Sequence, residues 1–299
     1  MFDVIVVGGG PAGLSAALML GRALRTTLVL DSGEYRNAPA AAMHNFLTRD
    51  GTPPRELRRL AREELAVYPT LEVRDLAVVG VEAAEGGFRV TLSDGTAQWA
   101  SRLLLATGLA DDLPPVEGLA ELWGRGVFHC PNCHGFEVRD VPIAVLGSGY
   151  RYAELALHLT RFGSDVALCG NGPADLGADM VHLLADHGVA VREEPIARLV
   201  ARDGELEGIE FVGGPPLARR AIFTGSRLRQ RSPLPAQLGC AGFDDGTIEV
   251  DDFGRSSVPG VYAAVIAAAA SGTIAGGLVD KELLSADLGL PSPLSAAGS

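Results

Sequence analysis

The residues best suited to chemistry form one short run, Cys130-x-x-Cys133-His134, with His129 directly before it. Two cysteines at this spacing can close a small disulfide and reopen it by thiol exchange, and such pairs commonly include one thiol of lowered pKa. An unperturbed imidazole titrates near pH ~6.5, so His134 can take up and return a thiol proton at neutral pH. His129 can do the same for Cys130 or for a substrate. The run therefore predicts a redox-active dithiol.

Two other interpretations of the cysteine pair stay open. A structural zinc ion takes four ligands, usually from a second pair of cysteines or histidines, and the sequence offers none at a suitable spacing. We therefore expect no metal site. The other interpretation is that the two thiols are unrelated and buried, as we expect for Cys169 and Cys240, with each flanking histidine acting only as a hydrogen-bonded spacer.

A first glycine-rich loop, Gly8-x-Gly10-x-x-Gly13, follows an apolar run over residues 2–7 and opens a predicted helix. In such loops the first glycine allows a tight turn, and the second lets the backbone approach a pyrophosphate at the helix N-terminus. The third lets helix and strand pack closely. Asp31 ends the next predicted strand, at the right spacing to accept hydrogen bonds from ribose hydroxyls. We predict a dinucleotide site here rather than a simple glycine-rich turn.

A second loop, Gly147-x-Gly149, follows another apolar run but has Tyr152 in the third position. A tyrosine there would crowd the helix against the strand or cover the seat of the pyrophosphate. The next strand ends near residues 168–172, which include no acidic residue for a ribose and no Lys or Arg for a 2′-phosphate. The sequence therefore predicts a Rossmann-like domain that lacks the chemistry for binding a nicotinamide dinucleotide.

The two β-α-β patterns predict an α/β fold with two Rossmann-like, three-layer nucleotide-binding domains, the first of them discontinuous. Antiparallel strands are expected between the two patterns, over residues 71–79, 87–93 and 96–104, and a linker near residues 111–115. Residues 254–264 are expected to return to the first domain. The predicted boundaries are residues 1–113 and 233–299 for the first domain, and residues 114–232 for the second, which carries Cys130 and Cys133.

Composition excludes some partners. The 299 residues are 47% hydrophobic and 21% charged, with a net charge of -12, so a nucleic-acid backbone would be repelled. The chain starts directly with an apolar strand pattern, and we expect no secretory signal. The alanine-rich stretch 258–274 is interrupted by proline and glycine, which makes it a poor membrane span. We expect a cytoplasmic protein without a nucleic-acid or membrane partner.

Together these features resemble the low-molecular-weight thioredoxin reductase superfamily. Within it, the sequence is most similar to the dithiol oxidases of natural-product biosynthesis, such as the gliotoxin and holomycin enzymes. That closer similarity rests on His134, where thioredoxin reductases carry an acidic residue, on segment 31–39 and on the altered second loop. The matching features are Gly8–Gly13, Asp31, Ala106-Thr107-Gly108, Cys130-x-x-Cys133, the loop at Gly147 and residues 258–264.

The resemblance implies a thioredoxin reductase-type fold, bound FAD and a homodimer. Cys133 would face the flavin, Cys130 would exchange with a small-molecule dithiol, and His134, with His129, would deprotonate the substrate thiols. The substrate would leave as a disulfide, with electrons passing through FAD to O2 to give hydrogen peroxide. His44 is a further candidate to border the flavin. The implied FAD contacts are Gly8, Gly10, Pro11, Ala12, Gly13, Asp31, Ser32, Asn45, Thr107 and Gly108.

One departure from the family lies near the C-terminus. Family members continue Gly-Val-Tyr-Ala-Ala with Gly-Asp and a loop that holds the flavin, whereas Val265-Ile266 directly follow Ala264 here. Two alternative functions therefore stay open. One is an NAD(P)H-dependent thioredoxin or disulfide reductase, and the other is a flavin-free member that acts as a scaffold or ligand binder.

Overall fold

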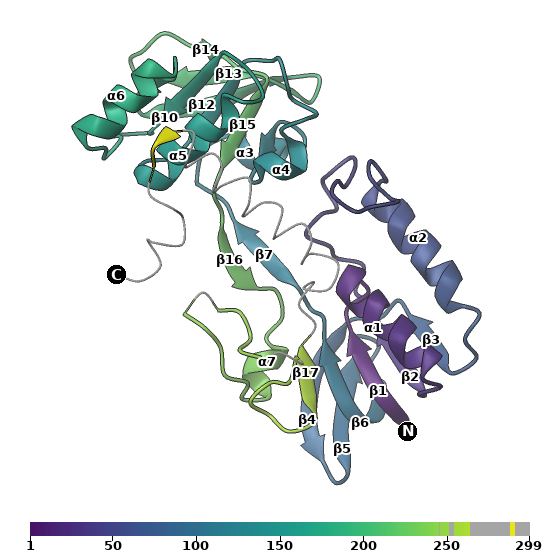
Figure 1. Ribbon diagram of the computed structural model, residues 1–299. Coiled ribbons are helices and arrows are strands. Elements are labelled where there is room, and N and C mark those ends of the chain that lie inside the picture. Colours follow the sequence, from purple (N-terminus) through teal and green to yellow (C-terminus); the bar gives the residue numbers. More distant parts are fainter. Residues whose placement is uncertain (245, 251–253, 264–287, 291–299) are drawn as a thin grey trace. The chain divides into compact units, whose positions relative to one another are not determined.

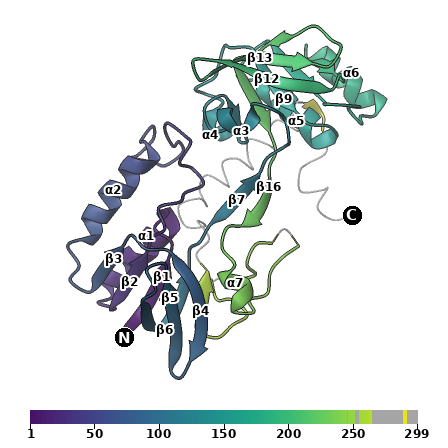
Figure 2. The same cartoon turned by 180° about the vertical axis from the view of Figure 1, so that it is seen from behind.

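The chain folds into two compact units in a computed structural model that describes residues 1–244, 246–250, 254–263 and 288–290. Figure 1 shows its helices and strands, and Figure 2 shows them from behind. Each unit is described by itself. The first consists of Met1–Ala38, Thr52–Asp112 and Leu228–Ala270, and the second of Pro39–Gly51, Leu113–Arg227 and Ser271–Ser299.

The first unit is built on one sheet with the strand order β3-β2-β1-β6-β5-β4, in which β17 also pairs with β6. The long strand β6 pairs antiparallel with β5 over its first half and parallel with β17 over its second. Because β17 comes from the far end of the chain, its pairing confirms that the first domain is discontinuous. The strands are β1 (Phe2–Val7), β2 (Thr27–Leu30), β3 (Leu71–Arg74), β4 (Val78–Ala84), β5 (Gly87–Leu92), β6 (Ala97–Leu105) and β17 (Val261–Ala263).

The strand predicted over residues 71–79 is wrong in both extent and direction. The structure has two strands there, and the first, β3, runs parallel to β2 at the edge of the sheet. The pairing ends at Arg74 because its partner strand ends at Leu30, and the exposed Asp75 interrupts the apolar run. The chain then starts β4, which pairs antiparallel with β5.

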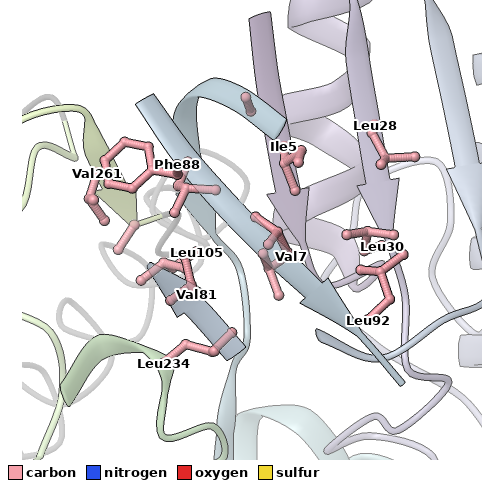
Figure 3. Close-up of a cluster of buried hydrophobic side chains, with 14 residues drawn as sticks. Ile5, Val7, Leu28, Leu30, Val81, Phe88, Leu92, Leu105, Leu234 and Val261 are labelled. Carbon is pink, nitrogen blue, oxygen red and sulfur yellow. The ribbon is translucent and has the colours of Figure 1, made fainter. Parts of the chain in front are cut away.

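Alternating residues of the central strands fill two separate cores, since successive side chains point to opposite faces of a sheet. Val6 and Val29 pack with helices α1 (Pro11–Arg22) and α2 (Pro54–Leu65). On the other face, Ile5 and Leu28 lie in a cluster that extends through β4, β5 and β17 to the short helix α7 (Leu234–Gln237), as Figure 3 shows. Both faces of the sheet are thus covered. This packing fixes the end of β1, where the first glycine loop begins, and the end of β2, where Asp31 follows.

The second unit has a parallel sheet in the order β11-β10-β9-β15-β8 and a separate antiparallel sheet, β12-β13-β14. Ile143 and Val145 of β9 pack with the helices α5 and α6, whereas Ala144 and Leu146 pack with α3 and the antiparallel sheet. The predicted α/β class with two Rossmann-like domains is confirmed. The elements are α3 (Leu119–Leu122), β8 (Val127–Phe128), α4 (Pro131–His134), β9 (Ile143–Leu146), α5 (Tyr150–Leu159), β10 (Val166–Cys169), α6 (Ala178–Asp186), β11 (Ala190–Arg192), β12 (Ile196–Arg202), β13 (Glu205–Phe211), β14 (Leu217–Ala218) and β15 (Ala221–Thr224).

Two further strands, β7 (Leu109–Asp112) and β16 (Arg227–Gln230), pair with each other where the chain leaves the first unit and returns to it. The compact units differ from the predicted boundaries in four described stretches, residues 39–51, 113, 228–232 and 288–290, of which the first is the longest. Residues 39–51 belong to the second unit, although the sequence assigned them to the first. The physical reason is contact with α4, where the Asn45 side-chain amide donates to the Asn132 carbonyl at 2.6 Å.

The C-terminal stretch is largely outside the described residues. The position after Ala264, where the family's Gly-Asp is missing, falls there, as does most of the alanine-rich segment 258–274. Among the helices that the structure does describe, none combines the length and the apolar character needed to cross a membrane.

Candidate redox and nucleotide sites

The Cys130–Cys133 pair is at the start of α4, directly after β8. Cys130 is the extended residue before the helix, and its carbonyl accepts from the backbone N–H groups of Cys133 and His134 at 3.2 and 3.3 Å. The two cysteines form a disulfide, with their Cα atoms 5.3 Å apart. A Cβ on Gly135 would lie 2.8 Å from the Phe162 ring, so glycine allows the end of α4 to pack closely against the residues after α5.

His134 has the environment of a neutral base. Its ring stacks on Phe128 with the centroids 4.4 Å apart. Its Nδ1 is buried and has no hydrogen-bond partner among the residues that the structure describes. Burial lowers the pKa of His134, and the charges of His44 and His129 lower it further, whereas Glu137 opposes them. A neutral imidazole with an unengaged nitrogen can accept a proton from a thiol.

His129 is exposed, and its ring stacks on Trp123 at a centroid distance of 6.0 Å. The other two thiols differ from this pair. Cys169 is fully buried, and burial raises the pKa of its thiol to about 11, as expected for an inert thiol. Cys240 is less buried than predicted, because it is only partly covered where it packs against the core of the first unit. Within the described residues, no group of three or more His, Cys, Asp or Glu side chains could hold a metal ion.

The first glycine loop has the geometry of an open cradle. Gly8 has a φ of +114°, and a Cβ there would lie 2.2 Å from the Ala106 carbonyl oxygen. A Cβ on Gly13 would lie 1.9 Å from the Gly8 oxygen, so α1 can approach the strand only with glycine at this position. Gly10, by contrast, has nothing within 4 Å of its Cβ position and no side-chain cap on the helix that it precedes. The free N–H groups at this open end fit a pyrophosphate.

Asp31 lies beside this cradle and is almost fully buried. Its carboxylate accepts from Gly33 N at 3.1 Å, from the Tyr35 hydroxyl at 2.5 Å and from Arg62 at 2.6 Å. Burial alone would raise the pKa of Asp31, but these hydrogen bonds outweigh it and lower the pKa. Burial and Asp31 together raise the pKa of Tyr35 to about 12. A carboxylate has about four acceptor positions. Three of them are used here, which holds the charged group in place and leaves one position for a ribose hydroxyl.

The structure gathers nearly all of the predicted FAD contacts at one edge of the first unit's sheet. They follow the carboxyl ends of β1, β2 and β6, which are neighbouring strands. In an open α/β sheet, this is the edge where ligands bind. The residues brought together here, besides the loop glycines and Asp31, are Pro11, Ala12, Ser32, Thr107 and Gly108.

Asn45 is not among them, and lies in the second unit against α4. Its side chain donates to the carbonyl of Asn132, which stands between the two cysteines. Beside it, the imidazole of His44 lies between Asp50 (Nδ1 to Oδ2, 3.5 Å) and Glu137 (Nε2 to Oε1, 3.4 Å). Its ring also faces His134 edge-on, with the centroids 6.2 Å apart. No sequence signal indicated these contacts, since the two segments are 87 residues apart.

The second glycine loop differs in that the ring of Tyr152 packs on its first glycine. A Cβ on Gly147 would lie 2.4 Å from the Tyr152 ring, and one on Gly225 would lie 2.7 Å from the Tyr152 hydroxyl. Gly147 and Gly225 follow β9 and β15, which are adjacent at the centre of the sheet. The ring therefore packs across the strand ends where a dinucleotide would lie in this fold. The loop keeps its backbone form and is open at Gly149, but a tyrosine ring covers the strand ends beside it.

Two Rossmann-like units, one of them with a Cys-x-x-Cys disulfide, define a disulfide oxidoreductase of the two-domain nucleotide-binding class. Residues 2–265 match the family described as pyridine nucleotide-disulphide oxidoreductase, and the chain belongs to this family. The thioredoxin reductase aclD of Aspergillus oryzae is 34% identical over 277 residues, which make up 88% of this chain and 87% of the relative.

Two solved structures are similar along nearly the whole chain. The crystal structure of HlmI has a TM-score of 0.80 and 38% sequence identity, and the match includes 95% of each chain. The putative thioredoxin reductase TrxB from Bacillus anthracis has a TM-score of 0.84 and 30% identity, over 94% of this chain and 99% of that one. The resemblance to thioredoxin reductase-like proteins that the motifs indicated is confirmed.

Proposed function

We propose that this oxidoreductase is an FAD-dependent dithiol oxidase, which converts a small-molecule dithiol to a disulfide through Cys130 and Cys133. O2 is the final electron acceptor. The observation that carries the proposal is the contrast between the two loops. The third position of the first loop is a glycine, whereas in the second loop it is Tyr152, whose ring packs on Gly147 and Gly225 at the strand ends where NAD(P)H would have to bind in a reductase. Electrons must then enter from the thiol side.

The thiol step uses residues of the second unit. A substrate thiolate attacks the sulfur of Cys130, forming a mixed disulfide as the bond to Cys133 breaks. His134 accepts the substrate proton and returns it to the Cys133 thiolate. The second substrate thiol then attacks the mixed disulfide and gives its proton to the sulfur of Cys130. The substrate has lost two electrons and two protons, and both cysteines are thiols. His129, which is exposed, assists at the substrate thiols.

FAD would be held by the first loop, Asp31 and the strand ends described above. The family typically binds this cofactor, and the open Gly10 position fits its pyrophosphate. When bound, FAD carries the two electrons from the dithiol to O2, which with two protons leaves as hydrogen peroxide. We also propose a homodimer in the cytoplasm, where reducing conditions favour catalytic over structural disulfides.

A second candidate is an NAD(P)H-dependent thioredoxin or disulfide reductase. It is favoured by the names of relatives such as aclD, which is a thioredoxin reductase. The two candidates differ in the source of electrons, so one spectroscopic experiment separates them. The same spectrum tests the flavin-free alternative, because a colourless protein that takes up no added FAD would support a scaffold or ligand binder.

The experiment is anaerobic addition of dithiothreitol and, separately, NADPH to the purified yellow protein. The oxidase predicts that the dithiol bleaches the flavin and that NADPH does not. Cys130→Ser and Cys133→Ser should each abolish bleaching by the dithiol, and Cys240→Ser, which removes a thiol outside the pair, serves as the control. Bleaching by NADPH at a comparable rate would make the protein a reductase, and dithiol turnover in either cysteine variant would remove the thiol mechanism.

A further inference from the structure

We propose that His44 and Glu137 are positioning residues that act on His134 in opposite directions. Segment 39–51, which carries His44, is then part of the redox site. The inference rests on the thiol chemistry proposed above. It concerns residues outside the Cys-x-x-Cys motif that act through the histidine beside the disulfide.

Segment 39–51 is hydrogen-bonded to α4 at a residue between the two cysteines. The Asn45 amide donates to the Asn132 carbonyl at 2.6 Å, and the Asn45 N–H donates to Asp50 at 2.8 Å. Asn45 has a φ of +64°, a left-handed conformation that asparagine tolerates better than most residues. Together these contacts fix the backbone directly after His44 relative to the two cysteines.

The side chain of His44 lies next to His134. Its side chain is 15% exposed and lies between the carboxylates of Asp50 and Glu137. Its ring edge meets His134 at 6.2 Å, with an interplanar angle of 80°. At that separation, away from bulk water, one unit charge changes the energy of another by an amount that matters for proton transfer.

The groups that face His134 act in opposite directions. His44, from segment 39–51, and His129, before α4, disfavour a second positive charge and lower its pKa after the larger effect of burial, while Glu137, after α4, raises it. The face packed on β8 is apolar, through Phe128. His44 therefore keeps His134 neutral and ready to accept a thiol proton. Glu137 stabilises the imidazolium while it holds that proton.

The test compares two variants that remove opposite charges, His44→Gln and Glu137→Gln, with His182→Gln, an exposed histidine on α6, as control. The rate at which dithiothreitol reduces the Cys130–Cys133 disulfide is measured from pH 5 to 9 by alkylation and mass spectrometry, which does not depend on FAD. The acid limb of the profile should move to higher pH in His44→Gln and to lower pH in Glu137→Gln. On the acid limb of the wild-type profile, the rate should fall roughly threefold in the first and rise roughly threefold in the second.

A rescue variant separates charge from packing. His44→Lys restores a positive charge and should bring the acid limb back toward the wild-type position. Shifts in the same direction for both glutamine variants, or no shift in either, would overturn the pairing, since a structural role would disturb both alike.

An NMR titration of the His134 ring in the same variants distinguishes this inference from the proposed function. If the ring titration shifts upward in His44→Gln and downward in Glu137→Gln but the wild-type protein oxidises no dithiol, the proposed function fails and the pairing stands. If the wild-type protein oxidises dithiols but the titration is unchanged in both variants, the pairing fails and the function stands.

Discussion

The two glycine loops share a backbone plan and differ in what fills them. Each follows a buried strand and opens a helix, at Gly8–Gly13 in the first unit and at Gly147–Tyr152 in the second. In the first loop, the third position is a glycine pressed against the turn, and the middle is open at Gly10. In the second, the third position is a tyrosine whose ring lies against the turn glycine.

The comparison shows that a Rossmann fold can be kept while the residues of its nucleotide-binding site change. Packing of the sheet and helices needs the strand, the helix and a tight turn, and both loops provide them. Binding a pyrophosphate needs an empty space at the helix N-terminus. In the second loop the Tyr152 ring covers the strand ends at Gly147 and Gly225, while the apolar core beneath it, from Ile143 to Phe223, remains buried. The fold of the second unit therefore carries no information about whether it binds a nucleotide.

The largest expected effect is at the third position of the first loop. In Gly13→Ala, the new methyl group would lie 1.9 Å from the Gly8 carbonyl oxygen, so helix α1 must move away from the strand. We expect the free energy of unfolding of the first unit to fall by about 3 kcal/mol or more, together with loss of flavin. Thermal denaturation and the ratio of absorbance at 450 nm to that at 280 nm measure the two effects. Unchanged stability would show that the helix is not pressed against the turn.

The matching change in the second loop is Tyr152→Gly, which restores the glycine pattern. Loss of a half-buried ring should cost about 2 kcal/mol, with Tyr152→Phe, which keeps the ring, as the control. We expect NADPH still not to bleach the flavin, because β10 ends at Cys169 and Gly170 without a ribose partner. Bleaching by NADPH in this variant alone would show that the tyrosine ring is the sole obstacle, and the two loops would then differ by one residue.

Sequence reasoning succeeded where structure depends on local pattern. The strand β1 has the bounds of the apolar run over residues 2–7 that predicted it, because strands buried on both faces appear as continuous apolar runs. Sequence reasoning failed at residues 71–79, where the length of the neighbouring strand β2 decides where pairing stops. The sequence of residues 71–79 does not indicate the length of β2, the strand with which it pairs.

The candidate sites also divide into parts that a local sequence pattern predicts and parts that depend on contacts between distant segments. The first loop, Asp31 and the cysteine pair are motifs with fixed spacing, and the structure places each where its motif requires. The contacts of His44 and Asn45 with α4 join segments that are far apart in the chain. No spacing rule connects them, so a single sequence could not indicate that segment 39–51 reaches the disulfide.

A smaller effect is expected at the middle position of the first loop. Gly10 has an extended backbone that any residue adopts, and its Cβ position is open. Gly10→Ala should therefore leave the stability of the apoprotein unchanged and lower its affinity for FAD about tenfold, or about 1.4 kcal/mol, by occupying the pyrophosphate space. Fluorescence titration of the apoprotein with FAD measures this.

Gly177→Ala is a matched control for that variant. Gly177 also precedes a helix with an extended backbone and an open Cβ position, but it lies outside both loops. Its FAD affinity should equal that of the wild type. An equal loss in both variants would mean that Gly10 contributes through general stability and not through an open cradle.

The smallest effect is the pH dependence of Asp31, which has no counterpart at the end of β10. The pKa of Asp31 is lowered in the folded protein, so its charge stabilises the fold above the unfolded value of about 3.9, and this contribution is lost as the pH falls through the folded value. In urea unfolding of the apoprotein, Asp31→Asn should cost about 1 kcal/mol at pH 7 and less at pH 3. A cost that is the same at both pH values would mean that the hydrogen-bonding shape of the side chain matters and its charge does not. The first loop would then differ from the second in geometry alone.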